Sequence, residues 1–334
     1  MNIAFYTPHM TLRGTEVTLY DFAKYNEDLL GNKSIVIYNE NSSWNHPTVI
    51  QKFKDRFKDN LICLKGPNFE FAWNAEITVP LLDKVLLEKK CDGLFMQKFG
   101  HNDGVISKMC KTFVMCAAPV CEPHGDVYSY VSEWLSEFAS QGKYPFVPSM
   151  VDLPEVEEDF REILNIPKDA VVFGRTGGLD SWNLPWASEV IKKIVDENSH
   201  IYFIFQNTPQ FYMHQNIKYI PPTADMKFKT KFINTCDAMI HARHEGESFG
   251  VACGEFSIKN KPIITWFGSK DRNHIKLLGE KGYYYNTPQE LFNTLVSFKK
   301  QPEKDWNCYK DFSPEKIMKI FKRVYLDKIV KEYK

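Results

Sequence analysis

The feature that most constrains this chain is a regular alternation of short apolar runs with helical patterns along its 334 residues. Short apolar runs bounded by polar or glycine-containing segments favour buried strands, and the 3.6-residue periodicity between them favours helices. Strands that alternate with helices in this way pair in parallel, because the crossover between two parallel strands is usually a helix. The alternation therefore predicts an α/β protein.

The alternation forms two series, separated by residues 147–158, V-P-S-M-V-D-L-P-E-V-E-E. Two prolines and an acidic run interrupt the periodicity there, as in a linker. In the first series we expect strands at 3–6, 35–38, 61–64, 93–96, 113–116 and 146–147, with helices at 15–30, 77–88 and 127–138. In the second we expect strands at 171–174, 201–205, 217–220, 238–241, 263–265 and 283–285, with helices at 187–196, 227–234, 249–257 and 288–297. The sequence thus predicts Rossmann-like domains at residues 1–150 and 151–312, followed by a segment at 313–334.

The C-terminal segment has the pattern of one amphipathic helix over residues 314–334. Its apolar stripe consists of Ile317, Ile320, Phe321, Tyr325, Ile329 and Tyr333. Its charged residues are mostly basic: Lys316, Lys319, Lys322, Arg323, Lys328, Lys331 and Lys334 against Glu315, Asp327 and Glu332. We interpret this basic face as a solvated surface, with weak peripheral contact to an anionic membrane as the alternative.

Composition excludes several classes of protein. The formal net charge is +0, from 42 basic and 42 acidic residues, so no global field favours nucleic acid. The eight cysteines are scattered without a zinc-site spacing, which indicates free thiols and a reducing compartment. The N-terminus lacks the pattern of a signal peptide, and no apolar run approaches 18 residues. We expect a cytoplasmic protein.

The segment I-H-A-R-H-E-G-E-S-F-G-V-A-C-G-E-F-S-I at residues 240–258 carries two carboxylates, Glu247 and Glu255. A strand ends before it, and a helix rich in small residues is expected from about Phe249. Free N–H groups at a helix start bind phosphate. Eight residues of helix return Glu255 to within about 80° of Glu247. Both carboxylates can then accept hydrogen bonds from hydroxyl groups on either side of a bound diphosphate.

This spacing resembles the Glu-x7-Glu signature of retaining GT-B glycosyltransferases, particularly glycosyltransferase family 4. The resemblance implies two Rossmann-like domains whose parallel sheets face each other across a cleft, with the last helix crossing back to the first domain. It implies that Glu247 contacts the donor sugar and Glu255 the nucleotide ribose. It also gives donor-binding roles to Ser248, Phe249, Gly250 and Val251. Arg243, just before Glu247, is expected to touch sugar hydroxyls.

The loop after the first strand, with Arg13 and Gly14, resembles the family's Gly-Gly-x-Glu loop, whose glycine lets the backbone approach the donor phosphates. Arg13 replaces the first glycine of that motif. Two interpretations of Arg13 stay open: it adds a charge to the diphosphate, or it is a solvated loop residue.

The loop after the first strand of the second series reads G-R-T-G-G-L-D at residues 174–180. The family binds the leaving diphosphate here with an arginine and, about five residues later, a lysine. Arg175 matches the arginine, but position 180 is Asp. Gly177 and Gly178 either form a compensating nest of N–H groups or a simple turn.

His124, in C-E-P-H-G-D at residues 121–126, corresponds by resemblance to a histidine between donor and acceptor. It would position the acceptor hydroxyl or the 6-position of the sugar. A turn residue is the plainer interpretation, and His101 is the competing histidine.

Together these features predict a metal-independent, retaining glycosyltransferase (EC 2.4 class) with catalytic Glu247, Arg175 and His124. The chain has no Asp-x-Asp for a metal–diphosphate site, and no Gly-x-Gly-x-x-Gly follows its first strand. We expect no metal and no cofactor beyond the substrate, a UDP- or GDP-linked sugar, and a glycan, lipid-linked or protein acceptor. A sugar-nucleotide epimerase of the same architecture and a noncatalytic nucleotide-sugar-binding protein are the alternatives.

Overall fold

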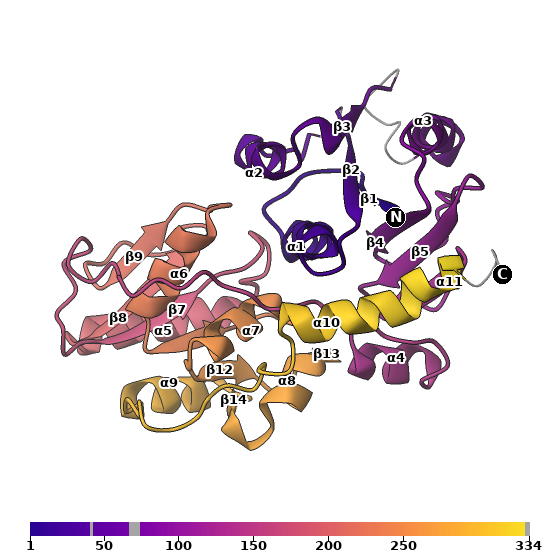
Figure 1. Ribbon diagram of the computed structural model, residues 1–334. Coiled ribbons are helices and arrows are strands. Elements are labelled where there is room, and N and C mark those ends of the chain that lie inside the picture. The colour runs from indigo at the N-terminus through magenta and orange to yellow at the C-terminus, as the bar shows by residue number, and fades with distance from the viewer. Residues whose placement is uncertain (41–42, 67–73, 331–334) are drawn as a thin grey trace. The chain divides into compact units, whose positions relative to one another are not determined.

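The computed structural model describes residues 1–40, 43–66 and 74–330, and the chain divides into two compact units (Figure 1). Unit 1 comprises Met1–Met150 and Phe312–Lys334, and unit 2 comprises Val151–Asp311. Each unit has its own six-stranded sheet. All strand pairs in both sheets are parallel, as the alternation of strands and helices predicts.

The sheet of unit 1 has the strand order β3-β2-β1-β4-β5-β6. Its strands are β1 (Asn2–Thr7), β2 (Lys33–Asn39), β3 (Leu61–Leu64), β4 (Gly93–Lys98), β5 (Lys111–Cys116) and β6 (Val127–Tyr130). The order reverses beside β1, where the chain moves from β3 back to β4. In open α/β sheets, ligands bind at the carboxyl ends of strands near such a reversal. The carboxyl ends of β2, β1 and β4 are therefore the part of unit 1 best placed to hold a ligand.

The helices of unit 1 connect these strands. They are α1 (Gly14–Asp28), α2 (Pro47–Phe57) with the 3-10 turn η1 (Lys58–Asn60), α3 (Ala75–Glu88) and α4 (Glu133–Ser140). The prediction of a helix over 127–138 is wrong in its first part, because Val127–Tyr130 is strand β6, paired with β5. The helix begins only after Ser132, whose hydroxyl accepts a hydrogen bond from the Leu135 amide at 3.1 Å.

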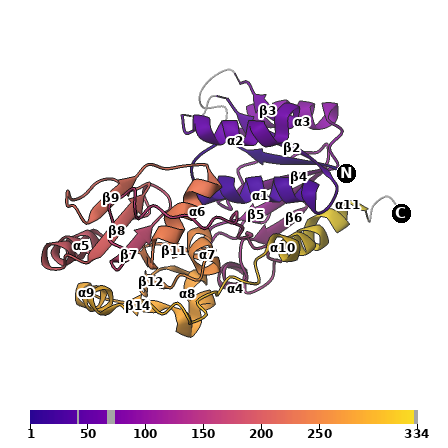
Figure 2. The same cartoon turned by 60° about the vertical axis from the view of Figure 1, so that its left-hand side comes forward.

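The C-terminal segment packs onto the sheet of unit 1, beside α1 (Figure 2). It consists of α10 (Pro314–Phe321), the π-helical turn η4 (Lys322–Leu326) and α11 (Asp327–Val330). The Phe321 ring stacks on Phe22 at 5.0 Å and on Phe5 at 6.3 Å between centroids. The Tyr325 hydroxyl shares a hydrogen bond with the hydroxyl of Ser129, 2.5 Å away. Residues 331–334 of the predicted helix lie outside the described residues.

The sheet of unit 2 has the strand order β14-β12-β10-β7-β8-β9. Its strands are β7 (Val171–Arg175), β8 (Ile201–Gln206), β9 (Ile217–Ile220), β10 (Ala238–His241), β12 (Ile263–Trp266) and β14 (Tyr283–Tyr285). Its helices are α5 (Pro185–Glu197), α6 (Met226–Thr235), α7 (Val251–Ile258), α8 (Asn273–Leu278), the 3-10 turn η3 (Gly279–Lys281) and α9 (Pro288–Ser297). The reversal of strand order lies beside β7, so β7 and β10 end where a ligand is expected.

A two-stranded parallel pair in unit 2, β11 (Gly246–Glu247) and β13 (Asp271–Arg272), was not expected from the sequence. It fixes the loop that carries Glu247 against the segment that precedes α8. Within the described residues, no helix combines the length and the apolarity needed to cross a membrane.

Candidate active site

The Glu-x7-Glu segment lies at the carboxyl end of β10 and turns sharply into α7. The segment turns at Gly246 and again at Gly250, and these residues have positive φ angles of 76° and 92°. A Cβ atom on Gly246 would lie 2.1 Å from the carbonyl oxygen of Asp271, and one on Gly250 would lie 3.0 Å from the hydroxyl of Tyr309. Glycine is therefore required at both positions by backbone conformation and by space.

Glu247 lies between two basic side chains. Its Oε1 accepts a hydrogen bond from Nε2 of His241 at 3.1 Å and one from Nη1 of Arg243 at 3.2 Å. Burial by itself would raise the pKa of Glu247, but Arg243 and His241 outweigh burial and hold the pKa at about 2. The side chain keeps 19% of its surface exposed. Glu247 is thus an ionised, oriented acceptor that a ligand can reach.

Two buried histidines continue the network behind Glu247. Nδ1 of His241 lies 2.9 Å from the Thr265 hydroxyl, which lies 3.1 Å from Nε2 of His274. The other ring nitrogen of His274 is buried and has no hydrogen-bond partner. Burial, and then the charge of His241, lower the pKa of His274 to about 3. His274 is therefore neutral, and the network holds the His241 ring in the orientation that presents Nε2 to Glu247.

Glu255 lies in the second turn of α7 and is 1% exposed. Its Oε1 accepts a hydrogen bond from Nζ of Lys229 on α6 at 2.6 Å. Its Oε2 is buried and has no hydrogen-bond partner among the residues that the structure describes. A buried carboxylate oxygen without a donor is costly, and a water molecule or a ligand hydroxyl that donated to it would be stabilising.

The N-terminus of α7 is built mainly from backbone. Gly250 is the N-cap, so no cap side chain competes for the first amides of the helix. The Phe249 side chain is buried edge-on against Tyr309, with ring centroids 5.7 Å apart, and its carbonyl accepts hydrogen bonds from Nδ2 of Asn273 at 2.9 Å and from the Tyr309 hydroxyl at 3.1 Å. Ser248 and Val251, on either side, are half-buried.

The structure gives Arg175 other partners than the expected phosphate. Its two terminal nitrogens donate to five oxygens of the protein, and the residue is buried. These oxygens are the carbonyls of Gln206 (3.2 Å), Asn207 (2.9 Å) and Gly178 (2.7 Å) and the hydroxyls of Thr208 (2.7 Å) and Ser181 (2.6 Å). Through these bonds Arg175 joins the loops after β7 and β8, and its expected role toward the leaving diphosphate stays a prediction.

The glycine loop after β7 is held through its carbonyl groups. The Gly177 carbonyl accepts a hydrogen bond from Nδ2 of Asn207 at 2.9 Å, and the Gly178 carbonyl accepts one from Arg175 at 2.7 Å. Gly177 has a φ of +156°, and a Cβ there would lie 3.0 Å from the Ser181 hydroxyl. No lysine takes the place of Asp180. Arg243 is a partly exposed cation near this loop: its side chain is 35% exposed, and its charge reaches both Arg175 and Asp180.

In unit 1, His124 is buried and both ring nitrogens are engaged. Nδ1 donates to the Glu122 carbonyl at 2.7 Å, so Nε2 accepts from Nζ of Lys98 at 3.3 Å. The same ammonium group of Lys98 donates to Asp103 at 2.5 Å and to the Val105 carbonyl at 2.9 Å. Burial lowers the pKa of His124. Both ring nitrogens of His124 are thus bonded within unit 1, and its expected role at the acceptor stays a prediction.

Gly14 begins α1, and Arg13 is its N-cap residue. The Arg13 guanidinium lies over the ring of Trp44, 5.8 Å from its centroid. Glu16, in the first turn, is buried and accepts hydrogen bonds from the hydroxyls of Thr11 and, at 2.9 Å, Thr15. Burial raises the pKa of Glu16 to about 7, against the opposing effect of these bonds. The loop after β1 therefore carries a cation on an aromatic ring and a carboxyl group that titrates near neutrality.

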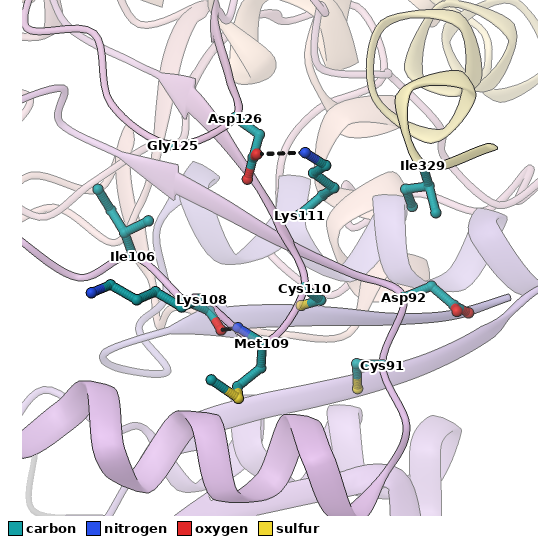
Figure 3. A pocket seen from close by; sticks show the side chains of 11 residues that line it. Cys91, Asp92, Ile106, Lys108, Met109, Cys110, Lys111, Gly125, Asp126 and Ile329 are labelled. Atoms are coloured by element: carbon teal, nitrogen blue, oxygen red, sulfur yellow. Dashed lines mark hydrogen bonds and ion pairs between the residues drawn. The ribbon is translucent and has the colours of Figure 1, made fainter. Parts of the chain in front are cut away.

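A hollow of about 710 Å³ in unit 1 lies away from these residues (Figure 3). It is lined by residues at the amino ends of β4, β5 and β6, among them Cys91, Cys110 and Gly125. Lys111 and Asp126 form an ion pair of 3.0 Å at its wall. Because ligands of parallel sheets bind at the carboxyl ends of the strands, we assign the candidate site to the opposite edge.

Several residues that shape the site were missed from the sequence. Lys229 lies mid-helix with no local motif, so nothing in the sequence connects it to Glu255. Lys98 was also unassigned, although it is the last residue of β4 and a polar residue at a strand end is a recognisable signal. His241, the last residue of β10, is also a polar residue at a strand end, whereas no such sequence feature marks His274.

No protein-family model matches the chain, and no curated protein matches its sequence. Solved structures do match it over nearly its whole length. HepE from Anabaena, in complex with UDP and glucose, superposes with a TM-score of 0.68 at 13% identity, covering 100% of this chain and 98% of the other. Sucrose-phosphate synthase from Thermosynechococcus elongatus superposes with a TM-score of 0.70 at 11% identity, covering 99% of this chain and 100% of the other. A putative UDP-N-acetylglucosamine 2-epimerase from Listeria monocytogenes superposes with a TM-score of 0.63 at 12% identity, covering 98% of this chain and 97% of the other.

At these identities the similarity concerns the fold. The matching structures share two parallel sheets flanked by helices, an arrangement common to glycosyltransferases and to a sugar-nucleotide epimerase. The chain therefore has the GT-B fold, with its C-terminal helix in the first unit.

Proposed function

We propose that the chain is a metal-independent, retaining glycosyltransferase that moves a sugar from a nucleoside-diphosphate sugar to an acceptor hydroxyl. The observation that carries the proposal is the unpartnered Oε2 of Glu255, buried in the second turn of the helix whose N-terminus follows the ionised Glu247. The matches to structures named as glycosyltransferases or UDP-sugar complexes support the same class.

In this proposal the donor is held by unit 2. The ribose donates a hydroxyl hydrogen bond to Oε2 of Glu255, in place of the missing partner. The diphosphate meets the first amides of α7, including those of Gly250 and Val251, and the positive end of the helix dipole. The sugar donates hydroxyl hydrogen bonds to Glu247, which stays ionised because its pKa is about 2.

Arg243 supplies the cation that the loop after β7 lacks. Arg175 is occupied by protein oxygens, whereas Arg243 is partly exposed beside Glu247. A guanidinium group binds phosphate oxygens through several donors at once. As the bond to the sugar breaks, charge develops on the departing phosphate, and Arg243 and the helix amides stabilise it. In the mechanism that the family resemblance implies, that phosphate oxygen then takes the proton of the acceptor hydroxyl.

The first experiment is a thermal-shift screen of the full chain against UDP-, GDP- and ADP-sugars and the corresponding free diphosphates. Stabilisation by one nucleotide series is expected. Products of prolonged incubation with that donor, separated by chromatography and followed by NMR, then identify the class: free sugar for a transferase, an epimer for an epimerase. Absence of stabilisation by every nucleotide contradicts the proposal.

The epimerase alternative has support of its own in the match to the putative Listeria enzyme. Nucleotide binding without turnover instead indicates a noncatalytic binder. Metal independence is tested on the same donor: turnover is expected to survive EDTA, and complete loss that Mn²⁺ reverses contradicts it.

Peripheral membrane contact of the C-terminal segment is the alternative to a solvated face and is tested separately. Ile317, Phe321 and Tyr325 are buried against unit 1, which leaves the lysines on the outer face. We expect no binding to vesicles, and co-sedimentation with anionic but not neutral vesicles at low salt contradicts that expectation.

A further inference from the structure

The helix α7 is short and depends on other parts of unit 2 for support. It has eight residues with Gly254 in its interior, and helices of this length owe their stability to tertiary packing rather than to intrinsic propensity. A Cβ atom on Gly254 would lie 2.6 Å from Cγ2 of Val151 and 2.8 Å from Cδ1 of Tyr309. Glycine at this position therefore lets two distant segments of unit 2 pack directly against the backbone of the helix.

One of these segments, residues 306–309, is hydrogen-bonded to α7 and to the turn that follows the helix; we call it the strap. The Trp306 amide donates to Oδ1 of Asn260 at 2.7 Å. The Ser257 hydroxyl, on the helix, accepts from the Cys308 amide at 2.7 Å and donates to the Trp306 carbonyl at 3.1 Å. Ser257 is fully buried, so these bonds are shielded from water. The strap thus fixes the C-terminal half of α7.

At the other end of α7, the strap contacts the peptide group that precedes the helix. The Tyr309 hydroxyl donates to the Phe249 carbonyl at 3.1 Å, and Nδ2 of Asn273, the first residue of α8, donates to the same oxygen at 2.9 Å. Both donor side chains are buried. A carbonyl oxygen has two lone pairs, so this pair of donors holds it from two sides.

The Phe249 carbonyl and the Gly250 amide belong to one planar peptide group. In a trans peptide the C=O and N–H bonds point in opposite directions, so a fixed carbonyl also fixes the direction of the amide. Donors at the oxygen polarise the peptide group and strengthen its N–H as a donor, because connected hydrogen bonds reinforce one another. An oriented, polarised N–H group suits an anion, since the group need not reorganise when the anion binds.

From these contacts we infer that Tyr309 and Asn273 are positioning residues for diphosphate binding, acting through the Phe249–Gly250 peptide group. The inference rests on the proposed function, in which the amide of Gly250 meets the diphosphate. A role of this kind has a specific signature. Loss of either donor weakens binding of the diphosphate, whose contact passes through the amide, and spares binding of the nucleoside.

The first test needs no ligand. Labelling with carbonyl-¹³C phenylalanine and ¹⁵N glycine selects the peptide groups of the Phe-Gly pairs in the sequence: Phe99-Gly100, Phe173-Gly174, Phe249-Gly250 and Phe267-Gly268. Tyr309→Phe removes only the hydroxyl and keeps the ring against Gly254. It is expected to move the amide signal of Gly250, which Phe249→Leu identifies by its loss, and to leave the other pairs in place. An unmoved Gly250 signal overturns the inference.

The second test measures affinity by titration calorimetry with UDP, GDP and ADP and with the corresponding nucleosides. Tyr309→Phe and Asn273→Ala are each expected to weaken binding of the diphosphate about fivefold, as for the loss of one neutral hydrogen bond, and to leave nucleoside affinity within about twofold. The matched control is Tyr325→Phe, which removes a buried tyrosine hydroxyl bonded to Ser129 in unit 1. This control is expected to change neither affinity. Thermal melting establishes that each variant is folded.

This inference and the proposed function fail in different ways. Diphosphate affinity that is equal in wild type, Tyr309→Phe and Asn273→Ala overturns the inference alone. Equal losses for nucleoside and diphosphate also overturn it, because the two residues then act only by holding α7 as a whole. A wild-type chain that binds none of the three nucleoside diphosphates overturns the proposed function and this inference with it.

Discussion

Lys229 donates to one carboxylate oxygen of Glu255 at 2.6 Å and leaves the other oxygen of the same group without a partner. The pair joins α6 to α7 in a nearly dry environment, since both side chains are largely buried. The hydrogen bond to Oε1 fixes the orientation of the carboxylate. This orientation sets the direction in which Oε2 points. In the proposed function, Lys229 therefore sets the orientation in which Glu255 meets the nucleotide.

We predict that Lys229→Met destabilises the protein by about 3–5 kcal/mol, because it leaves a buried charge without its partner. The double variant Lys229→Met/Glu255→Leu is expected to recover most of this loss, since the uncompensated charge is gone. Denaturant unfolding of the three proteins measures both effects. A single variant as stable as wild type contradicts the structural role of the pair.

We predict that Glu255→Ala weakens binding of the bare nucleoside diphosphate by about 1.5–3 kcal/mol, the range for hydrogen bonds to a charged group. Titration calorimetry measures this directly, and the free diphosphate keeps the sugar contacts of Glu247 out of the measurement. The control is Glu189→Gln, an exposed carboxylate on α5. Unchanged affinity in Glu255→Ala refutes the ribose assignment.

For Arg243, we predict that Arg243→Ala reduces affinity for the nucleoside diphosphate roughly tenfold or more and leaves affinity for the uncharged nucleoside unchanged. Introducing the missing lysine, Asp180→Lys, into Arg243→Ala is expected to restore part of the loss. Arg323→Ala, which removes an exposed cation of η4 in unit 1, serves as the control. Equal losses for nucleoside and diphosphate would mean that Arg243 acts only by holding Glu247.

Because Arg175 is hydrogen-bonded to two loops, its removal is expected to lower the stability of the protein. Arg175→Ala deletes five hydrogen bonds that join two loops, so we predict a drop in melting temperature of roughly 5–10 °C. Loss of turnover is expected to follow from the disordered loops. Calorimetric melting decides the matter: an unchanged melting temperature with strongly reduced turnover would instead restore the direct catalytic role expected from the sequence.

Glu16 predicts a pH dependence of stability. Its pKa is raised from the ordinary carboxyl value to about 7 in the folded chain, so the folded state favours the protonated form. The resulting stability is fully present below about pH 4 and is lost as the pH rises toward 7, by up to roughly 3 kcal/mol. Glu16→Gln should remove this loss, whereas the exposed Glu76→Gln should not. Parallel pH profiles for wild type and Glu16→Gln contradict the prediction.

The architecture could be predicted because it depends on periodicity. Buried parallel strands are continuous apolar runs, and every main strand of unit 2 lies within a residue or two of its expected position. Val127–Tyr130 was assigned to a helix because its run continues without a break into the next helical pattern. Pairing with β5, which local sequence does not encode, makes it a strand.

The sequence could indicate candidate site residues only where they lie together in one segment. Glu247, Gly250 and Glu255 lie in a single stretch, so their spacing indicates a common purpose. Contacts from distant segments could not be seen: Lys229 reaches Glu255 from another helix, and Thr208 reaches Arg175 from the next strand. Arg175 matches a family motif by position, but the motif gives no sign of the hydrogen bonds that it makes to both loops.

The return of the C-terminal helix to unit 1 has a consequence for biosynthesis. Phe321 and Tyr325 complete an aromatic layer with Phe22, Phe95 and Phe113, yet they are translated after all of unit 2. Unit 2 is continuous in sequence and has all its strands before this helix leaves the ribosome. Unit 1 must wait with that layer uncovered, so nascent chains are most exposed to aggregation and to chaperones in the interval before residues 312–330 emerge.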